Sequence, residues 1–594
     1  LIKKKKNNNF YQYYFYTTIL LLIFVIIIFY QSITFNYLNN KVKQRLDDFG
    51  LLNLKKLPII LYYNISGFFE KKDKIYIDIN FKNYSKIEKN RITQLAANNP
   101  QEWISVNAKI KLNDEKKIRT KIRYKGDRYV HFFNPKNSSF KLNLKDGEKI
   151  LGLREFTLSK PRTRNYLHEW IFNQFLGDNH LIKPSHEYVN LFVNGDNLGL
   201  YYLEEGFSKE MIERNKKKDS PIFSINEDLT GDINITVPEV YNLKYWKKSN
   251  PELLDIGATK LDNFFKGKKN IDEVMDLEKW AMFFALTDLN QTIHGILPKS
   301  VKYYFNSITY KFEPIGFDAH YIKRYVNNIS NNKYINMKGF EDKRLLIEMY
   351  QNPITENDHV INEWLNLFFS NKNFIKLYFL KLETITNEIY LKNFFNNHKS
   401  NFKRNLKLIY ADYFFVDRVN YYGPGIYFFD ENYYYDRAKE IKKKIEFSSL
   451  KVFFKKKKNY FEIINQNLNK LIKLKNLKCI NQNKIYNISL DSVLLIDSQN
   501  GNLVFKIDFF EKYEKCFLLE FENSSKAFSH EIIDINFQTD YYDPINKNYD
   551  SNLKKYFNFN KKKISPKKNV VIDENIFIPA KYVVILNPKD EIII

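Results

Sequence analysis

The sequence is poor in cysteine: Cys479 and Cys516 are the only two cysteines among 594 residues. They form no C-x-x-C pair, so the sequence argues against a metal site built from cysteine. Both residues lie in the C-terminal third, where two states stay open. They pair in a disulfide if that part lies outside the cytoplasm, or they remain two buried thiols.

Signatures of nucleic-acid binding are also missing, although the chain is strongly basic. Its formal net charge is +26, but lysine is spread along the whole length, together with abundant asparagine, isoleucine, phenylalanine and tyrosine. A basic footprint for nucleic acid would be concentrated on one face or element. We therefore expect no nucleic-acid partner. With 44% apolar and 27% charged residues and no repeat of fixed period, the chain has the composition of a globular protein.

Charged residues are absent from residues 10–35, which include the apolar run from Thr17 to Tyr30. This segment is long enough to cross a hydrocarbon core of roughly 30 Å. The basic run Lys3–Lys6 precedes it and should stay in the cytoplasm. We predict a single-pass anchor within residues 1–35, with the lipid bilayer as partner and the body on the extracytoplasmic side. A cleaved signal peptide is the rival interpretation, but no small-residue cleavage site follows the apolar run.

The pattern after a polar connector at residues 36–56 predicts an α+β body over residues 57–415. Alternating strands and hairpin signals gather in its first part, and helical spacing follows in its second part. This order predicts a strand-rich first lobe and a more helical second lobe. The expected strands lie at residues 103–113, 118–124, 139–144, 188–193, 198–203, 301–305 and 310–315, and the expected helices at 164–175, 277–285 and 364–412.

The composition changes around Gly423-Pro424-Gly425. We expect a mixed connector at residues 416–475, with a basic helix from Arg437 to Lys473, and a β-rich domain at residues 476–594. The last short apolar strands fit two architectures equally well. One is the start of a right-handed parallel β-helix, and the other is a small β-sandwich.

Three polar clusters lie on the strands of the first lobe. Arg123 and Lys125 precede Gly126, and basic groups beside a glycine turn can hold phosphate because the backbone approaches closely there. Lys141, on the next strand, is placed to reach phosphates as a kinase lysine does. The run from Leu200 to Glu205 ends in two carboxylates, which can position a lysine or bind a metal. Alone, each cluster is more often a charged hairpin end or a solvated surface pair.

Two aspartates flank the last predicted hairpin of the body. Asp288 follows an amphipathic helix, with His294 close behind, and Asp318 ends the last strand, with His320 near it. Paired carboxylates at the base of a hairpin suit Mg²⁺, a hard cation that prefers oxygen ligands and keeps waters for phosphates. As isolated features, the aspartates are ordinary caps or turn residues and the histidines ordinary structural side chains.

Taken together and in this order, these segments resemble the kinase family of spore coat protein H. The resemblance runs from about Asn107 to about Tyr410. It implies an atypical protein-kinase-like body of two lobes that transfers the γ-phosphoryl group of ATP to a serine or threonine hydroxyl of a protein, with Mg²⁺ or Mn²⁺ as cofactor. The most telling stretches are IRYKGD (122–127), LGLREFTLSKPRTRNYLHEWIFNQFL (151–176), YVNLFVNGDNLGLYYLEEGFSKEMIERN (188–215), SINED (224–228) and YYFNSITYKFEPIGFD (303–318).

The resemblance also implies roles for single residues. Asp318 matches the family's metal-binding aspartate, and Asp288 matches its second active-site aspartate, which lies near the transferring phosphate or acts as catalytic base and shares the metal. Lys141 matches a basic strand residue that contacts phosphates. These three residues supply what phosphoryl transfer needs, namely a metal held by carboxylates and cations on the phosphates.

Four further residues are matched by position. Arg123 and Lys125 lie in the family's R-x-K-G-D-like turn, Arg164 matches an arginine at the start of a helix, and Glu205 matches the acid that closes the G-x-Y-x-x-E-E run and positions a basic residue. All four are predicted to contribute to the nucleotide site.

The chain departs from the family pattern at two places, and two functions therefore stay open. Ser300 stands where relatives carry an asparagine, and residues 137–141 weaken a strand expected to contain K-W-S-F-R. The retained pair of aspartates favours an active membrane-anchored kinase in the cell envelope. The departures and the β-rich tail favour a catalytically inactive relative that acts as an envelope scaffold or binding module.

Overall fold

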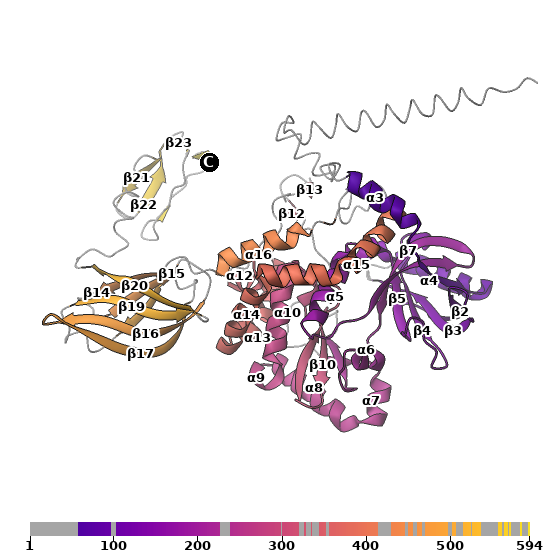
Figure 1. The fold of residues 1–594 in the computed structure, drawn as a ribbon, viewed down its shortest axis with the longest axis horizontal. Coiled ribbons are helices and arrows are strands. Elements are labelled where there is room, and N and C mark those ends of the chain that lie inside the picture. Colours follow the sequence, from indigo (N-terminus) through magenta and orange to yellow (C-terminus); the bar gives the residue numbers. More distant parts are fainter. Residues whose placement is uncertain are drawn as a thin grey trace, which may run out of the picture.

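The computed structural model has an α+β body, followed by a seven-stranded sheet and several short strand pairs (Figure 1). The predicted α+β class is confirmed. The predicted anchor at residues 10–35 lies outside the described residues, and none of the described helices is long and apolar enough to cross a membrane. The structure describes residues 57–96, 102–126, 128–225, 238–298, 300–319, 326–327, 334–335, 344–351, 356–413, 429, 431–445, 450–455, 460–465, 470–496, 502–506, 515–523, 526–535, 556–560, 563–567, 570–571, 583–584 and 592–593.

Seven strands of the first part close into a barrel (Figure 1). Their order around the barrel is β1-β2-β3-β4-β5-β7-β6, and β1 and β6 close it as a parallel pair. A barrel thus stands where the sequence predicts a strand-rich lobe, and it does not by itself confirm a two-lobed kinase body. The strands are β1 (Asp73–Asp78), β2 (Val106–Leu112), β3 (Ile118–Tyr124), β4 (Phe140–Leu144), β5 (Glu155–Ser159), β6 (His186–Val193) and β7 (Asp196–Glu205).

Alternation along the strands separates the inside of the barrel from its outside. In β3, Ile118, Thr120, Ile122 and Tyr124 are buried, whereas the residues between them are exposed or half-buried. The two-residue period of a strand places these two sets on opposite faces. The inward set joins an apolar cluster with its counterparts on the other barrel strands. The outward set is therefore available for polar chemistry.

The predicted hairpin between β6 and β7 is confirmed. Asn194 and Gly195 have φ values of 50° and 90°, as a tight hairpin turn requires. The side-chain oxygen of Asn194 also accepts a hydrogen bond from the backbone N–H of Ile79, at 2.7 Å. The turn thereby joins the hairpin to the end of β1 and fixes the β6–β7 register.

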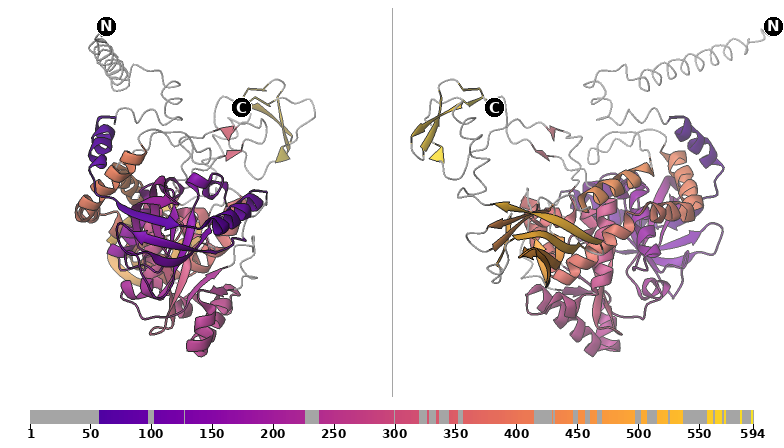
Figure 2. Two further views of the ribbon diagram at one scale, coloured as in Figure 1. Left: turned by 90° about the vertical axis from the view of Figure 1, so that its right-hand side faces the viewer. Right: turned by 60° about the vertical axis from the view of Figure 1, so that its left-hand side comes forward.

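A mostly helical part follows the barrel and surrounds a four-stranded antiparallel sheet of order β11-β10-β8-β9. Two further views show this part beside the barrel (Figure 2). The sheet contains β8 (Ile222–Ile225), β9 (Pro238–Val240), β10 (Lys302–Asn306) and β11 (Lys311–Ile315). Helix α3 precedes the barrel strands, and α4 and α5 lie between them in sequence. Across the described residues the α-helices are α3 (Leu57–Phe68), α4 (Phe81–Leu95), α5 (His168–Asp178), α6 (Lys209–Arg214), α7 (Leu243–Ser249), α8 (Pro251–Phe265), α9 (Ile271–Val274), α10 (Leu277–Asn290), α11 (Ile293–Ile296), α12 (Leu346–Gln351), α13 (Glu356–Phe369), α14 (Lys372–Ile385), α15 (Glu388–Asp412) and α16 (Asn432–Ile445).

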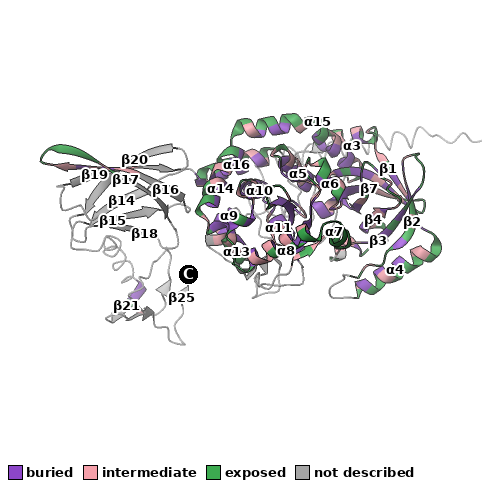
Figure 3. Ribbon diagram, turned by 90° about the horizontal axis from the view of Figure 1, so that it is seen from below, coloured by how far each residue is buried: buried purple, intermediate pink, exposed green. Residues whose placement is uncertain are grey.

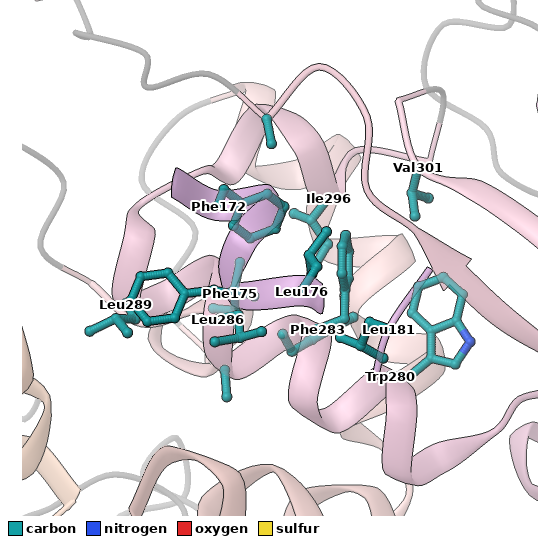
Figure 4. Close-up of a cluster of buried hydrophobic side chains, with 14 of the residues drawn as sticks. Phe172, Phe175, Leu176, Leu181, Trp280, Phe283, Leu286, Leu289, Ile296 and Val301 are labelled. Atoms are coloured by element: carbon teal, nitrogen blue, oxygen red, sulfur yellow. The ribbon is translucent and has the colours of Figure 1, made fainter. Parts of the chain in front are cut away.

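The core of the helical part lies where α5 crosses α10. Figure 4 shows Phe172, Phe175 and Leu176 of α5 packed with Trp280, Phe283, Leu286 and Leu289 of α10. The predicted helix at residues 164–175 is shifted: residues 161–164 form a short 3₁₀ turn, and α5 itself runs from His168 to Asp178. The 3₁₀ turn begins at Pro161, which cannot continue a preceding strand and favours a first helical position.

The C-terminal sheet corrects one prediction. The basic helix expected from Arg437 to Lys473 ends at Ile445, and strands begin at Leu450. Runs such as LKVFFK and YFEIIN are rich in the aromatic and β-branched residues that favour strands. The sheet has the order β17-β16-β19-β20-β14-β15-β18. Its strands are β14 (Leu450–Lys455), β15 (Tyr460–Asn465), β16 (Lys470–Asn481), β17 (Lys484–Ile496), β18 (Asn502–Lys506), β19 (Lys515–Asn523) and β20 (Lys526–Ile535).

The two cysteines fall on neighbouring strands of this sheet. Cys479 is disulfide-bonded, and Cys516, the other cysteine of the chain, is its Cα partner in the β16–β19 register. Of the two states left open by the sequence, the structure has the disulfide.

The remaining described strands are short. They form the pairs β12 (Val326–Asn327) with β13 (Tyr334–Ile335), β21 (Phe557–Asn560) with β22 (Lys563–Pro566), β22 with β24 (Val583–Val584), and β23 (Val570–Val571) with β25 (Ile592–Ile593). The pairs β22–β24 and β23–β25 are parallel, as successive rungs of a β-helix would be. The β-helix and the domain limits at residues 416–475 and 476–594 stay predictions.

Candidate active site

A row of polar residues crosses five neighbouring barrel strands. The registers pair Arg123 with Lys141, Lys141 with Thr157, Thr157 with Glu204, and Glu204 with His186. Paired residues share one face of a sheet. Arg123 lies between the inward-facing Ile122 and Tyr124 of β3, so the shared face is the outer face of the barrel. The row therefore forms a continuous polar strip on the outside of the barrel.

Arg164 meets this row from the 3₁₀ turn that precedes α5. Its guanidinium lies 3.4 Å from Glu204 of the barrel, 2.8 Å from Glu169 of α5, and 2.7 Å from Asp318, which follows β11. Arg164, Glu169 and Glu204 are buried. One arginine thus connects the barrel, α5 and the loop after β11 through three carboxylates, and its planar fork of donors suits such a role.

Asp318 is held in a restricted geometry. Its φ is +56°, a left-handed value that aspartate tolerates better than most residues but that still costs energy. Its two carboxylate oxygens lie 2.7 Å from Arg164 Nη1 and 3.2 Å from His294 Nδ1. Nδ1 of His294 is also 3.0 Å from the backbone oxygen of Asp318, so this nitrogen is placed to be the donor. Strain at this position is typical of functional sites.

Two glycines bring the Asp318 segment close to its neighbours. A Cβ on Gly295 would lie 2.9 Å from the Cα of Ala319, and a Cβ on Gly316 would lie 2.6 Å from Cδ1 of Leu176. Glycine permits such close approach of backbone to backbone and to side chains. The segment Gly316–Ala319 is therefore packed between α5 and α11.

Three cations gather around the ring of Phe317. Lys125 Nζ lies 5.5 Å from the ring centre, Lys302 Nζ 5.4 Å, and the guanidinium carbon of Arg164 5.9 Å. These distances suit cation–π contacts. The three residues come from the β3 end, from β10 and from the turn before α5, so the site collects positive charge from three separate parts of the chain. Such a cluster is suited to a polyanionic ligand such as a nucleoside triphosphate.

Burial and charge act in opposite directions on the site carboxylates. Burial raises the pKa of Glu169 to about 8, despite the nearby Arg164. Burial alone would also raise the pKa of Glu204, but Arg164, Lys125 and His186 together hold it well below its ordinary value. Burial lowers the pKa of Lys125, although Glu204 opposes this shift. Glu204 is therefore the ionised partner of the cations, and Glu169 is largely protonated at neutral pH.

Glu169, His186 and Glu204 form a buried group whose donor atoms all lie within 4.8 Å of one another. Carboxylate and imidazole ligands suit several divalent metals. Arg164, however, already supplies a positive charge to both carboxylates of this group. The geometry therefore fits a charge-compensated arginine site, and Asp318 remains the better candidate for a metal in contact with phosphate.

The structure gives Asp288 different partners from those of Asp318. One oxygen of the buried Asp288 carboxylate accepts a hydrogen bond from the hydroxyl of Tyr378 at 2.6 Å, and the other accepts from the backbone N–H of Leu346 at 2.9 Å. Arg437 donates to its backbone oxygen at 3.0 Å. Burial raises the pKa of Asp288 to about 7. Asp288 therefore ties α10 to α12 and α14 through its carboxylate and to α16 through its backbone oxygen.

Three other predicted residues lie in the polar row or contact it. Lys125 is 3.7 Å from Glu204 and belongs to the site. Lys141 lies in the polar row and pairs with Glu155 at 2.5 Å. Arg123 lies beside Lys141 in the row, donates to the backbone oxygen of Tyr124 at 3.1 Å, and has its pKa lowered by burial.

Glu205 faces away from the polar row. It ion-pairs with Arg214 and accepts a hydrogen bond from the backbone N–H of Ser185 at 2.9 Å. Its neighbour Glu204 contacts Arg164 and Lys125 instead. Strand alternation explains the difference, because adjacent residues of β7 point to opposite faces. Glu205 thus pairs with a basic residue, as the resemblance implies, but with Arg214; its role at a nucleotide site stays a prediction.

Three further site residues were not assigned a role from the sequence: Glu169, His186 and Lys302. Glu169 and His186 lack any local motif, because their function depends on cross-strand register and on the contact of α5 with Arg164. Lys302 had a detectable signal, since it directly precedes three consecutive aromatic residues on the first strand of the predicted hairpin.

A comparison with protein families identifies the family of the chain. The model of the family described as CotH kinase protein matches residues 122–447, which is more than half of the 594 residues. The chain belongs to this family, as its motifs predicted. No curated protein matches the chain.

Proposed function

We propose that the protein is a protein kinase that transfers the γ-phosphoryl group of ATP to a serine or threonine hydroxyl at the cell envelope. Family membership suggests kinase chemistry. The observation that carries the proposal is that Arg164 contacts the Asp318 carboxylate and, together with Lys125 and Lys302, the ring of the adjacent Phe317. In this proposal the barrel and the helical part serve as the two lobes of an atypical kinase, and the polar row faces the nucleotide between them.

Asp318 is the residue best suited to hold Mg²⁺ or Mn²⁺. Its side chain is 23% exposed, unlike the buried Asp288, and a carboxylate oxygen is the ligand type that these hard cations prefer. When bound, the metal would neutralise charge on the β- and γ-phosphates. Arg164 and His294 orient the Asp318 carboxylate. One of these two side chains must move away from its carboxylate oxygen before that oxygen can bind a metal.

The lysines supply the remaining charge. Lys125 and Lys302 lie over the ring of Phe317, the residue before Asp318, and in this proposal they contact phosphate oxygens and fix the orientation of the transferred group. Lys141 and Arg123 extend the positive charge along the polar row. Glu204 holds Lys125 and Arg164 in place, which is a positioning role that requires its charged form.

We further propose that the body lies on the extracytoplasmic side of a membrane, anchored through residues 10–35. The support comes from two independent features. The basic run Lys3–Lys6 precedes an uncharged segment, and Cys479 is disulfide-bonded, which is typical of oxidising compartments outside the cytoplasm.

Calorimetric titration of ATP into the purified full chain in detergent tests the nucleotide site. We expect binding that requires Mg²⁺ or Mn²⁺ and that weakens at least about tenfold in Asp318→Asn, equivalent to about 1.4 kcal/mol. Asp255→Asn is the matched control, because Asp255 is exposed on α8 and its substitution should leave affinity unchanged. Absence of nucleotide binding in a well-folded wild-type protein would overturn the kinase proposal.

A catalytically inactive scaffold or binding module is the second candidate. This candidate is favoured because the carboxylate oxygens of both aspartates already have partners within the protein. The oxygens of Asp318 face Arg164 and His294, and those of Asp288 accept hydrogen bonds. Ser300, in place of the family's asparagine, is also buried. This function requires no metal-dependent nucleotide binding, so the same titration separates the two candidates.

A further inference from the structure

Helix α3 is apolar on two opposite faces. Its sequence, LPIILYYNISGF, contains no charged residue. One face, made by Ile60, Tyr63, Asn64 and Gly67, is buried or half-buried, and these positions follow the i, i+3, i+4, i+7 spacing of a helix. The other face carries large apolar side chains as well. A helix that is apolar all round normally lies inside a protein or in contact with lipid.

The inner face of α3 is explained by α15, which lies beside it (Figures 1 and 2). Tyr63 stacks on Tyr410 with ring centres 6.0 Å apart, and the side-chain amide of Asn64 donates to the backbone oxygen of Tyr410 at 2.7 Å. A Cβ on Gly67 would lie 2.1 Å from the backbone oxygen of Lys407. The close packing fixes the rotation of α3 and therefore which side chains point outward.

The outer face of α3 presents an unusual concentration of exposed apolar groups. Ile65 is 59% exposed and Phe69, just after the helix, is 86% exposed. Large exposed apolar patches on soluble proteins mark interaction surfaces. The burial map shows that the neighbouring α15, by contrast, carries an ordinary alternation of buried and exposed residues (Figure 3). The exposed set on and next to α3 is Ile59, Leu61, Tyr62, Ile65, Phe68 and Phe69.

We infer that this face of α3 lies in the interface of a lipid bilayer and sets the orientation of the body on the membrane. With 12 residues, α3 is about 18 Å long and too short to span a bilayer. Tyrosine suits the headgroup boundary, and phenylalanine and leucine suit the apolar face of a helix that lies in the interface. Lys55 and Lys56 precede the helix and Lys71 and Lys72 follow it, and such basic flanks attract anionic headgroups.

The length of the connector agrees with this placement. The inference rests on the proposed anchoring through residues 10–35, from which residues 36–56 lead directly to α3. Even a fully extended connector would keep α3 within about 70 Å of the membrane, and a compact one would keep it much closer. Anchor and surface helix would then act as two linked contacts, and the second contact would gain from the high local concentration that the first provides.

Site-directed fluorescence measures this contact directly. The full-length variant Ile65→Cys is labelled with an environment-sensitive fluorophore and reconstituted into vesicles of three parts phosphatidylcholine to one part phosphatidylglycerol, with or without nitroxide-labelled lipid. Because Cys479 is disulfide-bonded, labelling is directed to the introduced thiol. Phe133→Cys is the matched control, since Phe133 is 71% exposed but belongs to the barrel part.

We expect lipid nitroxide to quench the label at position 65 several-fold more than the label at position 133. Equal, weak quenching at both positions in protein that floats with the vesicles would overturn the α3 inference while leaving the anchor intact. Protein that does not float at all would overturn both the anchor and the α3 contact. If the lipid nitroxide does not quench the label at position 65 but its fluorescence changes when the protein is diluted, the face contacts a second copy of the chain instead of lipid.

Discussion

The residues around Arg164 show how one buried cation organises several carboxylates with different tasks. Glu204 is charged because the cations stabilise it, Glu169 is largely neutral because burial dominates, and Asp318 remains partly exposed at the edge. Desolvation and nearby charges shift protonation in opposite directions. The three carboxylates can therefore be distinguished by experiment, although they share a single arginine.

Glu169→Gln should change the pH dependence of stability in a defined direction. The folded pKa of Glu169 is about 8, above the value of about 4.3 expected in the unfolded chain. The folded state therefore binds more protons, and wild-type stability should fall as pH rises between these two values. Glutamine mimics the protonated acid, so the melting temperature of the variant relative to wild type should rise from about pH 5 to about pH 8 and level off above that. A difference curve that is flat over this range would contradict the raised pKa.

Asp288→Ala should destabilise the fold rather than weaken the nucleotide site. The substitution removes acceptors from two donors, Tyr378 Oη and Leu346 N, and each buried donor left without a partner costs about 1–3 kcal/mol. Denaturant unfolding should therefore show a loss of about 2–6 kcal/mol. ATP affinity, measured on the folded fraction, should change less than twofold. A large loss of affinity or phosphoryl transfer at unchanged stability would instead support the catalytic role expected from the family.

At the scale of elements, the position of Asp318 depends on close packing of α11 against the loop after β11. Gly295→Ala would place a methyl group 2.9 Å from both Cα and Cβ of Ala319, which forces the backbone of one segment to move. We expect metal-dependent ATP affinity to fall several-fold, because Asp318 adjoins Ala319 and His294 adjoins Gly295.

The double variant Gly295→Ala/Ala319→Gly provides the control for this prediction. Removing the methyl group of Ala319 relieves one of the two contacts, so part of the lost affinity should return in the same calorimetric titration. Equal affinity in wild type and Gly295→Ala would show that the loop adjusts without moving Asp318.

Individual elements of the body were predictable, whereas their juxtaposition was not. Alternation identified β2, β3 and β4, and Asn194-Gly195 identified the β6–β7 turn, because these signals act between neighbours in sequence. The partners of Asp288 lie 58 and 90 residues away, and the polar row depends on four strand registers. No single-residue pattern carries that information. The choice between Glu204 and Glu205 likewise required the phase of β7, which a one-residue error inverts.

At the scale of the whole molecule, the disulfide at Cys479 stabilises a sheet that follows the kinase-family region. Its partner in register is Cys516, so the bond closes a loop of residues 479–516. The chain-entropy relation for a loop of this size gives about 4 kcal/mol of stabilisation. Reduction of the disulfide should therefore lower the melting temperature of the C-terminal sheet. Differential scanning calorimetry of the full chain measures this change.

The body should respond much less to reduction, because the chain's two cysteines both lie in the C-terminal sheet. Metal-dependent ATP binding should persist in the reduced protein within about twofold. The Cys479→Ser variant should reproduce the calorimetric effect without a reducing agent. Simultaneous loss of both transitions would indicate that the sheet and the body unfold as a single cooperative unit.

The polar row on the barrel has a consequence for how this protein can diverge. Arg123, Lys141, Thr157, Glu204 and His186 share a face only because each strand keeps its phase. A substitution at one of these positions changes a single contact. Insertion or deletion of one residue within a strand would instead turn the side chains of that strand to the opposite face of the sheet. Relatives that keep this site are therefore expected to vary freely in the lengths of barrel loops and hardly at all in the lengths of these strands, so that evolutionary change is confined to substitution on the strands and to insertion between them.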